Sequence, residues 1–254
     1  YYQRHRAEMD RGARVLWPEK ESLYDLHVML WTDGAASFNS EKQNEATDPE
    51  RQIFYPQRWR RCTFDGATIT TSRGRRVHLS EAQIAVWLDP RASEQTQRRD
   101  YAALAVAARD RHGYVYLLSV DMRRDDVPGQ IARIWGAYDL YNNRARYGYE
   151  DNGFQVLMGR EFERVREQRR AASVASACGL QGYTSTTNKI DRIASLAPRM
   201  DNGWIEVEAG VSAEVIEQFR QIPTGGHDDG PDAAERAIWL VDGGGAARAV
   251  LGSR

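Results

Sequence analysis

The sequence predicts an α/β fold in which a mixed β-sheet is covered by helices. Three observations predict it: short apolar runs with strand character, turn residues between them, and segments of helical periodicity that return between the later strands. The order that results is βββαβαβα. Helices that return between strands favour a sheet with parallel as well as antiparallel neighbours.

The first segment, residues 1–60, reads as a linker. Proline follows Trp17, Asp48 and Tyr55 and interrupts two short helical stretches near 20–31 and 34–45. We therefore expect one domain over residues 61–254, preceded by the linker or tail of a domain that lies upstream.

The domain is expected to open with an auxiliary β-hairpin. Residues 67–71 and 76–79 have strand character and flank the turn Ser72-Arg73-Gly74-Arg75. The remaining elements follow in chain order: strands at 83–88, 101–107 and 114–120, a helix at 128–141, a strand ending at Tyr149-Glu150, a helix at 154–172, a strand at 182–186, a helix from 188–193, a strand at 203–208, and helices at 211–220 and 229–241.

Composition excludes several classes of protein. The 254 residues are 41% hydrophobic and 28% charged, as in a folded globular protein, and no run of about 18 apolar residues could span a membrane. Cys62 and Cys178 do not have the spacing of a zinc site. With 35 basic and 36 acidic residues, nucleic-acid binding would need a local patch. The three lysines lack the context of a phosphate-binding P-loop, so this chain is not itself expected to be a P-loop ATPase.

Acidic residues stand where a sheet would expose them together. Asp89 follows one apolar strand, Glu150 follows another, and Asp228 and Asp229 stand at the start of the last helix. Gathered carboxylates repel each other unless cations lie between them, and Mg²⁺ or Mn²⁺ prefers such oxygen ligands. Two ions about 3.5–4 Å apart can activate a water and stabilise the leaving oxygen of a phosphodiester. The pattern therefore predicts phosphodiester hydrolysis.

Each acid also has a simpler interpretation, as a turn residue or a helix cap. Asp232 lies one turn beyond Asp228 and could join the cluster or face solvent, since Gly230-Pro231 leaves the start of the last helix open. His227 could orient a metal ligand or a water, or simply bond to backbone.

An ordered set of motifs extends this interpretation: Trp87-Leu88-Asp89-Pro90, Glu150-Asp151-Asn152-Gly153, Asn188 to Ile193, and Gly226-His227-Asp228-Asp229-Gly230-Pro231-Asp232-Ala233. Together the motifs resemble the C-terminal nuclease domain of the large terminase subunit of tailed bacteriophages. The resemblance implies an RNase H-like fold and a two-metal endonuclease, with Mg²⁺ or Mn²⁺, that cuts concatemeric double-stranded viral DNA during packaging. It also implies an upstream ATPase domain.

The resemblance assigns the ligand roles to Asp89, Glu150, Asp228 and Asp229, and leaves open which of the last two is the main ligand. It further implies portal protein and the small terminase subunit as partners, no membrane, and action in the host cytoplasm at the procapsid portal.

Basic residues could bracket a duplex through phosphate contacts. The candidates are Lys189 and Arg192 near the fifth strand, and Arg73, Arg75 and Arg76 on the hairpin. Two other functions stay open at this point. Another RNase H-like nuclease, such as a resolvase or transposase core, would use the same acids, and a non-catalytic packaging interaction domain would keep the sheet without needing them.

Overall fold

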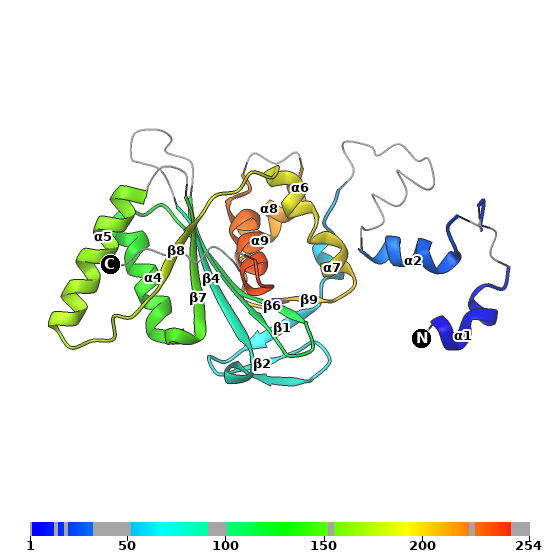
Figure 1. The fold of residues 1–254 in the computed structure, drawn as a ribbon, viewed down its shortest axis with the longest axis horizontal. Helices are drawn as coiled ribbons and strands as arrows, with labels where there is room; N and C mark the ends of the chain where they lie inside the picture. Colours follow the sequence, from blue (N-terminus) through cyan, green and yellow to red (C-terminus); the bar gives the residue numbers. More distant parts are fainter. Residues whose placement is uncertain are drawn as a thin grey trace.

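The computed structural model describes residues 2–12, 15–17, 20–32, 52–90, 101–151, 155–223 and 227–244. Within those ranges the centre is one nine-stranded sheet in the order β3-β2-β1-β9-β6-β5-β4-β7-β8 (Figure 1). The strands are β1 (Arg61–Phe64), β2 (Thr68–Thr70), β3 (Arg76–His78), β4 (Gln83–Asp89), β5 (Ala102–Arg109), β6 (Val115–Arg123), β7 (Ala145–Glu150), β8 (Leu180–Tyr183) and β9 (Ile205–Glu208).

Strands β4, β5 and β6 form the antiparallel meander that the sequence predicts, and they build the middle of the core. Their side chains alternate between the two faces, as pleated strands require. Ile84, Val86 and Leu88 are buried on one face, while Ala85 and Trp87 are buried on the other. A sheet covered on both faces explains why these strands read as nearly continuous apolar runs.

Strand β7 runs parallel to β4, and β8 runs parallel to β7. Leu88 pairs with Tyr149, so the last residues of β4 and β7, Asp89 and Glu150, end at the same edge of the sheet. Gly148 allows this close packing, because a Cβ there would lie 2.7 Å from the ring of Trp87. The mixed sheet that the sequence predicts is confirmed, with parallel pairs on both sides of the antiparallel meander.

Helices cover both faces of the sheet (Figure 1). Helices α4 (Val127–Tyr141) and α5 (Gln155–Ala171) lie on one face. On the other face are α6 (Lys189–Ala194), α7 (Ala197–Asp201), α8 (Ala213–Gln221) and α9 (Asp229–Val241). Helix α9 lies directly over β4, β5 and β6, so its first turn reaches the edge where β4 ends.

The predicted hairpin is confirmed as β2 and β3, with Ile69 opposite Val77. The sequence did not resolve β1 or α7, both of which are short. Strand β1 pairs with β2 and with the parallel strand β9, and so joins the hairpin to the main sheet. The hairpin lies beside the start of β4, at the end of the sheet opposite Asp89 (Figure 1).

Among the described residues, helices α1 (Tyr2–Met9) and α2 (Leu23–Thr32) precede the sheet, and the second matches the helix expected near 20–31. The helix expected near 34–45 lies outside the described residues. The division at residue 60 stays a prediction, but Phe54 and Trp59 on its N-terminal side pack against Phe219 in the core, with ring centroids 5.0 and 5.3 Å from that of Phe219. The packed body therefore includes these two residues as well as core residues of the described segments from 61 onward.

Candidate metal centre

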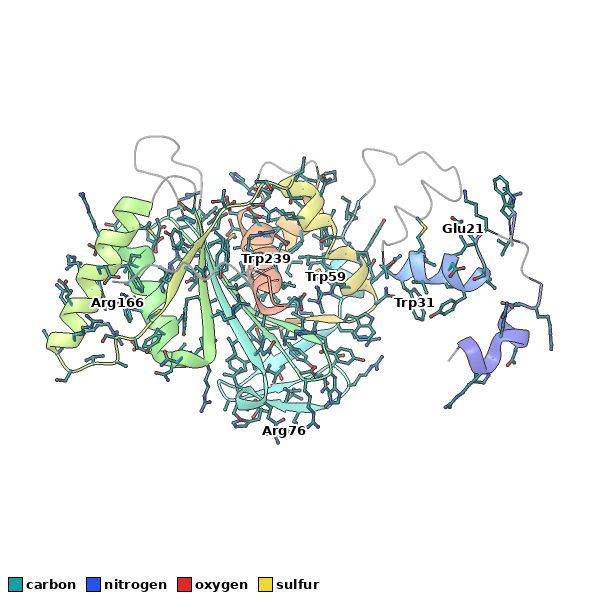
Figure 2. All side chains as sticks on the ribbon, in the orientation of Figure 1. Glu21, Trp31, Trp59, Arg76, Arg166 and Trp239 are labelled. Carbon is teal, nitrogen blue, oxygen red and sulfur yellow. The ribbon has the colours of Figure 1, made fainter. Side chains whose placement is uncertain are left out.

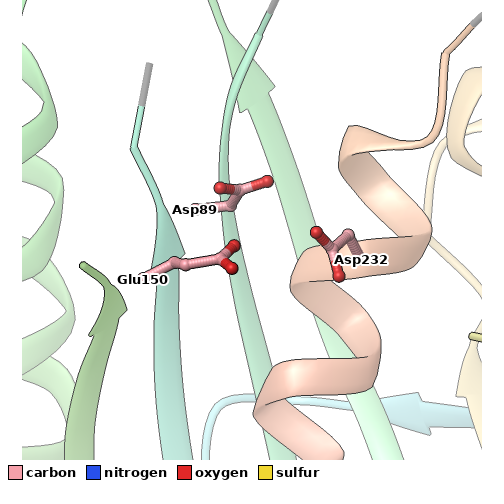
Figure 3. Close-up of side chains that lie close together, drawn as sticks. All are labelled: Asp89, Glu150 and Asp232. Atoms are coloured by element: carbon pink, nitrogen blue, oxygen red, sulfur yellow. The ribbon is translucent and has the colours of Figure 1, made fainter. Parts of the chain in front are cut away.

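Three carboxylates meet at the edge where β4 and β7 end. Asp89, Glu150 and Asp232 each offer an oxygen, and these oxygens all lie within 4.8 Å of one another. Figure 3 shows Asp89 and Glu150 coming from neighbouring strands and Asp232 pointing toward them from the first part of α9. Three oxygen donors at this spacing fall within reach of one hard divalent cation.

Asp232 reaches this position because of how α9 begins. Asp228 stands at the cap position, and Pro231 lies in the first turn, where its missing N–H costs no helical hydrogen bond. Gly230 donates its N–H to Gln218 Oε1 at 2.9 Å, and a Cβ at Gly230 would lie 3.0 Å from that same oxygen. Glycine thus lets the first turn pack against α8. Asp232, two residues further on, is 2% exposed.

Within the described part of the chain, the charges of these carboxylates are only partly compensated by basic residues. Burial raises the pKa of Asp89 well above its ordinary value, and the charges of Asp232 and Glu150 raise it further, while Lys189 partly opposes the shift. Burial and the charge of Asp232 also raise the pKa of Glu150. These acids would hold their charge more easily with an additional cation among them.

Lys189 is the basic residue at the mouth of the cluster. Asn188 caps α6 by accepting the N–H of Ile190 and so fixes the position of the next residue, Lys189. The Lys189 ammonium lies 2.8 Å from Asp228 Oδ1 and 3.1 Å from Asp232 Oδ2. Although burial opposes the charged form, Asp232 and the neighbouring acids raise the pKa of Lys189, so the ammonium stays protonated.

A buried network of ion pairs holds the Asp232 carboxylate. Arg192 Nη2 donates to Asp232 Oδ1 at 3.0 Å, and Arg192 Nη1 bonds to Glu235. Arg236 Nε donates to Glu235 Oε2 at 2.7 Å, and its guanidinium lies 4.8 Å from the ring centroid of Trp239. The sequence did not reveal Glu235 or Arg236, although their spacing after Asp232 on one helix was a usable signal.

The structure places the predicted ligands at different distances from the centre. Asp89 and Glu150 belong to the three-carboxylate group, and so does Asp232, which the sequence left open. Asp228 is engaged with Lys189 instead, and Asp229 lies close enough to Asp89 to raise its pKa. His227 is exposed at the start of this segment.

The predicted DNA-binding residues divide into two groups. Lys189 and Arg192 lie in the acidic cluster, and Arg192 is buried, so its guanidinium faces carboxylates and not solvent. The hairpin arginines lie at the opposite end of the sheet. Arg75 is bound there to Asp110 and Tyr116, whereas Arg73 and Arg76 are exposed (Figure 2 labels Arg76). The structure therefore does not bring the hairpin to the acidic cluster.

Comparison with known proteins identifies the class of domain. Residues 86–239, more than half of the chain, match the model of the terminase RNase H-like domain. The chain therefore belongs to the terminase RNase H-like domain family, and its large-terminase resemblance and RNase H-like fold are confirmed. A search of curated proteins found no match.

Solved structures of terminase nucleases are similar to this chain. The human cytomegalovirus terminase nuclease domain is 14% identical with a TM-score of 0.47, and the alignment covers 62% of this chain and 82% of that one. A manganese-soaked structure of the same domain has a TM-score of 0.45 at 14% identity, covering 62% and 81%. The large terminase nuclease of thermophilic phage G20c is 12% identical with a TM-score of 0.45, covering 74% and 97%.

Proposed function

We propose that this chain is the divalent-metal-dependent endonuclease domain of a viral DNA-packaging terminase. It would cut concatemeric double-stranded DNA by two-metal phosphodiester hydrolysis. The observation that carries the proposal is the convergence of Asp89, Glu150 and Asp232 at one sheet edge, in a chain of the terminase RNase H-like family.

The donor set fits Mg²⁺ or Mn²⁺. All three donors are carboxylate oxygens, the ligand type that hard divalent cations prefer. Among the described residues around the centre, three basic side chains face six carboxylates: Lys189, Arg192 and Arg236 against Asp89, Glu150, Asp228, Asp229, Asp232 and Glu235. This leaves a formal charge of −3 before an ion binds. Two divalent ions would reverse that charge to +1 and so favour an anionic DNA phosphate.

The residues of the chain would divide the work as follows. The bound ions would activate the attacking water and stabilise the leaving oxygen. Asp89, Glu150 and Asp232 would hold them, and Asp229, whose charge reaches Asp89, would contribute to the second position. Arg192 would keep the Asp232 carboxylate oriented. Because β4, β7 and α9 are core elements, the ligands stand on a rigid scaffold.

The biological setting is proposed from the family. Double-stranded DNA would be the substrate, and portal protein and the small terminase subunit would be partners at the procapsid in the host cytoplasm. Among the described helices, none combines the length and apolar character needed to cross a bilayer.

The test is cleavage of supercoiled plasmid with Mn²⁺, Mg²⁺, Ca²⁺ or EDTA. We expect nicking and linearisation with Mn²⁺ and Mg²⁺ that EDTA stops and Asp89→Asn abolishes. Asp242→Asn is the matched control, because Asp242 pairs with Arg199 just beyond the other end of α9 and should be dispensable.

Three results would contradict the proposal. Activity that survives in Asp89→Asn would place the chemistry elsewhere. A folded chain that neither binds Mn²⁺ nor cleaves DNA would favour a non-catalytic packaging role. Preference for branched junctions over linear duplex would favour a resolvase-like nuclease instead.

A further inference from the structure

Trp204 is exposed at the end of the sheet that carries the hairpin, the end opposite the three carboxylates. The residue is 48% exposed, and its ring stacks on that of Tyr114 with centroids 4.9 Å apart and planes 18° apart. We propose that this end of the sheet is a separate binding site for single-stranded DNA, which stacks an unpaired base on Trp204 and places its phosphates on nearby arginines. The Trp204 surface consists of Arg60, Arg73, Arg111, Tyr114 and Trp204.

Backbone hydrogen bonds hold the two stacked residues in place. Trp204 donates its N–H to the carbonyl of Arg199 at 2.8 Å, and its own carbonyl accepts the N–H of Val115 at 2.9 Å. Tyr114 donates its N–H to Asp110 Oδ1 at 3.0 Å, and its carbonyl accepts the N–H of Asp110 at 3.0 Å. The stack is therefore preformed, so a ligand that binds it has little chain to order.

Three arginines on the surrounding loops lack carboxylate partners. Among the residues that the structure describes, none of Arg60, Arg73 and Arg111 forms an ion pair. The side chain of Arg60 lies against Gly203, directly before the exposed tryptophan, where a Cβ would clash with it. Arg73 stands on the hairpin turn, and Arg111 stands on the turn between β5 and β6 that leads to the stack. All three can therefore offer their charge to a ligand.

Two acids at this end of the sheet are engaged within the chain. Asp110 and Glu206 are both buried. Arg75 binds Asp110, while Ser72 donates its N–H and its hydroxyl to Glu206 at 2.8 and 2.9 Å. Asp201, at the end of α7, is exposed and is one acid against the three arginines. The chain as a whole carries a formal charge of −1, so this surface supplies the local positive patch that nucleic-acid binding needs.

The combination of a flat aromatic face and unpaired arginines fits an unpaired nucleic-acid strand. Such a strand alternates planar bases with anionic phosphates, and aromatic stacking with basic contacts is how proteins bind single strands without sequence preference. In a duplex, neighbouring base pairs cover the faces that would stack on Trp204. An acidic peptide would match the arginines, but its carboxylates offer no flat apolar face to the indole. The choice of DNA over RNA rests on the proposed function.

The experiment measures binding of a fluorescent single strand of about 15 nucleotides by anisotropy. EDTA is present, so that binding is measured without cleavage. We expect Trp204→Ala to weaken binding by about tenfold or more, because one stacked base is lost, and Trp204→Phe to restore much of it. Trp31→Ala is the matched control, since Trp31 is an exposed tryptophan on α2, away from the hairpin (Figure 2).

The salt dependence of the same binding tests the arginines. Each phosphate contact of a single strand adds about 0.7 to the slope of log affinity against log salt concentration, so Arg73→Gln and Arg111→Gln should each lower the slope by about that amount. Arg160→Gln is the control, because Arg160 is an exposed arginine on α5 that forms no ion pair with any described residue. Unchanged slopes in both hairpin-end variants would overturn the phosphate contacts and the inference with them.

Further outcomes would also overturn the inference. These are no binding of the single strand, unchanged affinity in folded Trp204→Ala, or a duplex of the same sequence or an RNA strand that binds more tightly. Displacement of the strand by poly-glutamate as effectively as by unlabelled strand would favour an acidic protein as the partner instead. None of these results touches the metal centre. Loss of metal-dependent nicking with intact single-strand binding would overturn the proposed nuclease alone.

Discussion

Carboxylates at the two ends of the sheet have opposite environments. At one end, Asp110 accepts hydrogen bonds from Arg75, from the Tyr116 hydroxyl at 2.9 Å, and from the backbone N–H groups of His112 and Tyr114 at 2.8 and 3.0 Å. Burial would raise its pKa, but these donors lower it below its ordinary value. At the other end, burial and neighbouring acids raise the pKa of Asp89.

The difference distinguishes a structural carboxylate from one suited to an external ligand. Asp110 has its donors within the chain and connects the hairpin to the sheet through Arg75. Asp89 stands beside Glu150 and Asp232, and the basic residues that the structure describes around them carry too little positive charge to match them. Strongly perturbed acids of this kind concentrate at functional sites, whereas satisfied ones concentrate in structural networks.

The largest expected effect is on cleavage. Asp232→Asn should lower Mn²⁺-dependent plasmid nicking by about 100-fold or more, because it removes a proposed ligand, and loss of even an outer partner costs about 10–100-fold. Asp110→Asn should leave nicking within a few-fold of the unmodified chain. Equal losses in the two variants, measured under conditions where both are folded, would erase the distinction between the two ends.

The second largest expected effect is on stability, and it is expected at the end of the sheet that carries Asp110. Asp110→Asn should lower the free energy of unfolding by about 2 kcal/mol, since Arg75 and Tyr116 lose the charged acceptor that they share. Urea denaturation measures the change. Asp121→Asn is a suitable control because Asp121 is partly exposed, and a loss as large as that of Asp110→Asn would contradict the structural role given to Asp110.

A third effect tests the support of Asp232. Arg192→Lys keeps the charge but cannot reach Asp232 and Glu235 with two separate nitrogens, so we expect roughly tenfold weaker nicking. Arg199→Lys, in a partly exposed pair with Asp242, serves as control. Full activity in Arg192→Lys would show that charge alone positions the carboxylate.

The smallest effect is a pH dependence of opposite sign at the two ends. In EDTA, the folded chain binds more protons at Asp89 and Glu150 than the unfolded chain does, so stability falls as pH rises from their ordinary values of 3.8 and 4.5 through the raised pKa values. At pH 7.5, Asp89→Asn should therefore melt about 2 °C above the unmodified chain.

At the other end, the lowered pKa of Asp110 contributes stability that is present above 3.8 and is lost as pH falls through the folded value. Asp110→Asn should not show this loss of stability at acid pH. Melting temperatures measured from pH 3 to 8 would test both predictions. The same pH dependence in Asp89→Asn and Asp110→Asn would contradict the opposite pKa shifts given to the two carboxylates.

Local sequence predicts the elements well and the site in part. Asp89 and Glu150 were predictable because each directly follows an apolar strand, and the strands proved to be parallel neighbours. The sequence could not decide whether Asp232 joins the cluster or faces solvent, because Gly230-Pro231 does not reveal where the last helix begins. The reason for glycine there, close packing on Gln218 of another helix, depends on tertiary structure.

Long-range pairs account for what sequence could not supply. Arg75 meets Asp110, and Arg192 meets Asp232 and Glu235, across 35 residues or more of chain. The basic residues looked alike as candidate DNA contacts, and only the fold shows that Arg192 and Arg75 are bound to carboxylates. A single sequence carries no record of such partners, because no local spacing specifies them.

The order of the three gathered carboxylates along the chain has a consequence for synthesis. Asp89 and Glu150 emerge first, and Asp232 comes last, on the helix that closes over the sheet. At about 5–20 residues per second, a ribosome needs roughly 7–30 s to pass from Asp89 to Asp232. Throughout that interval the nascent chain holds an incomplete acidic cluster, so the cutting activity proposed here would arise only after almost the whole domain has been made.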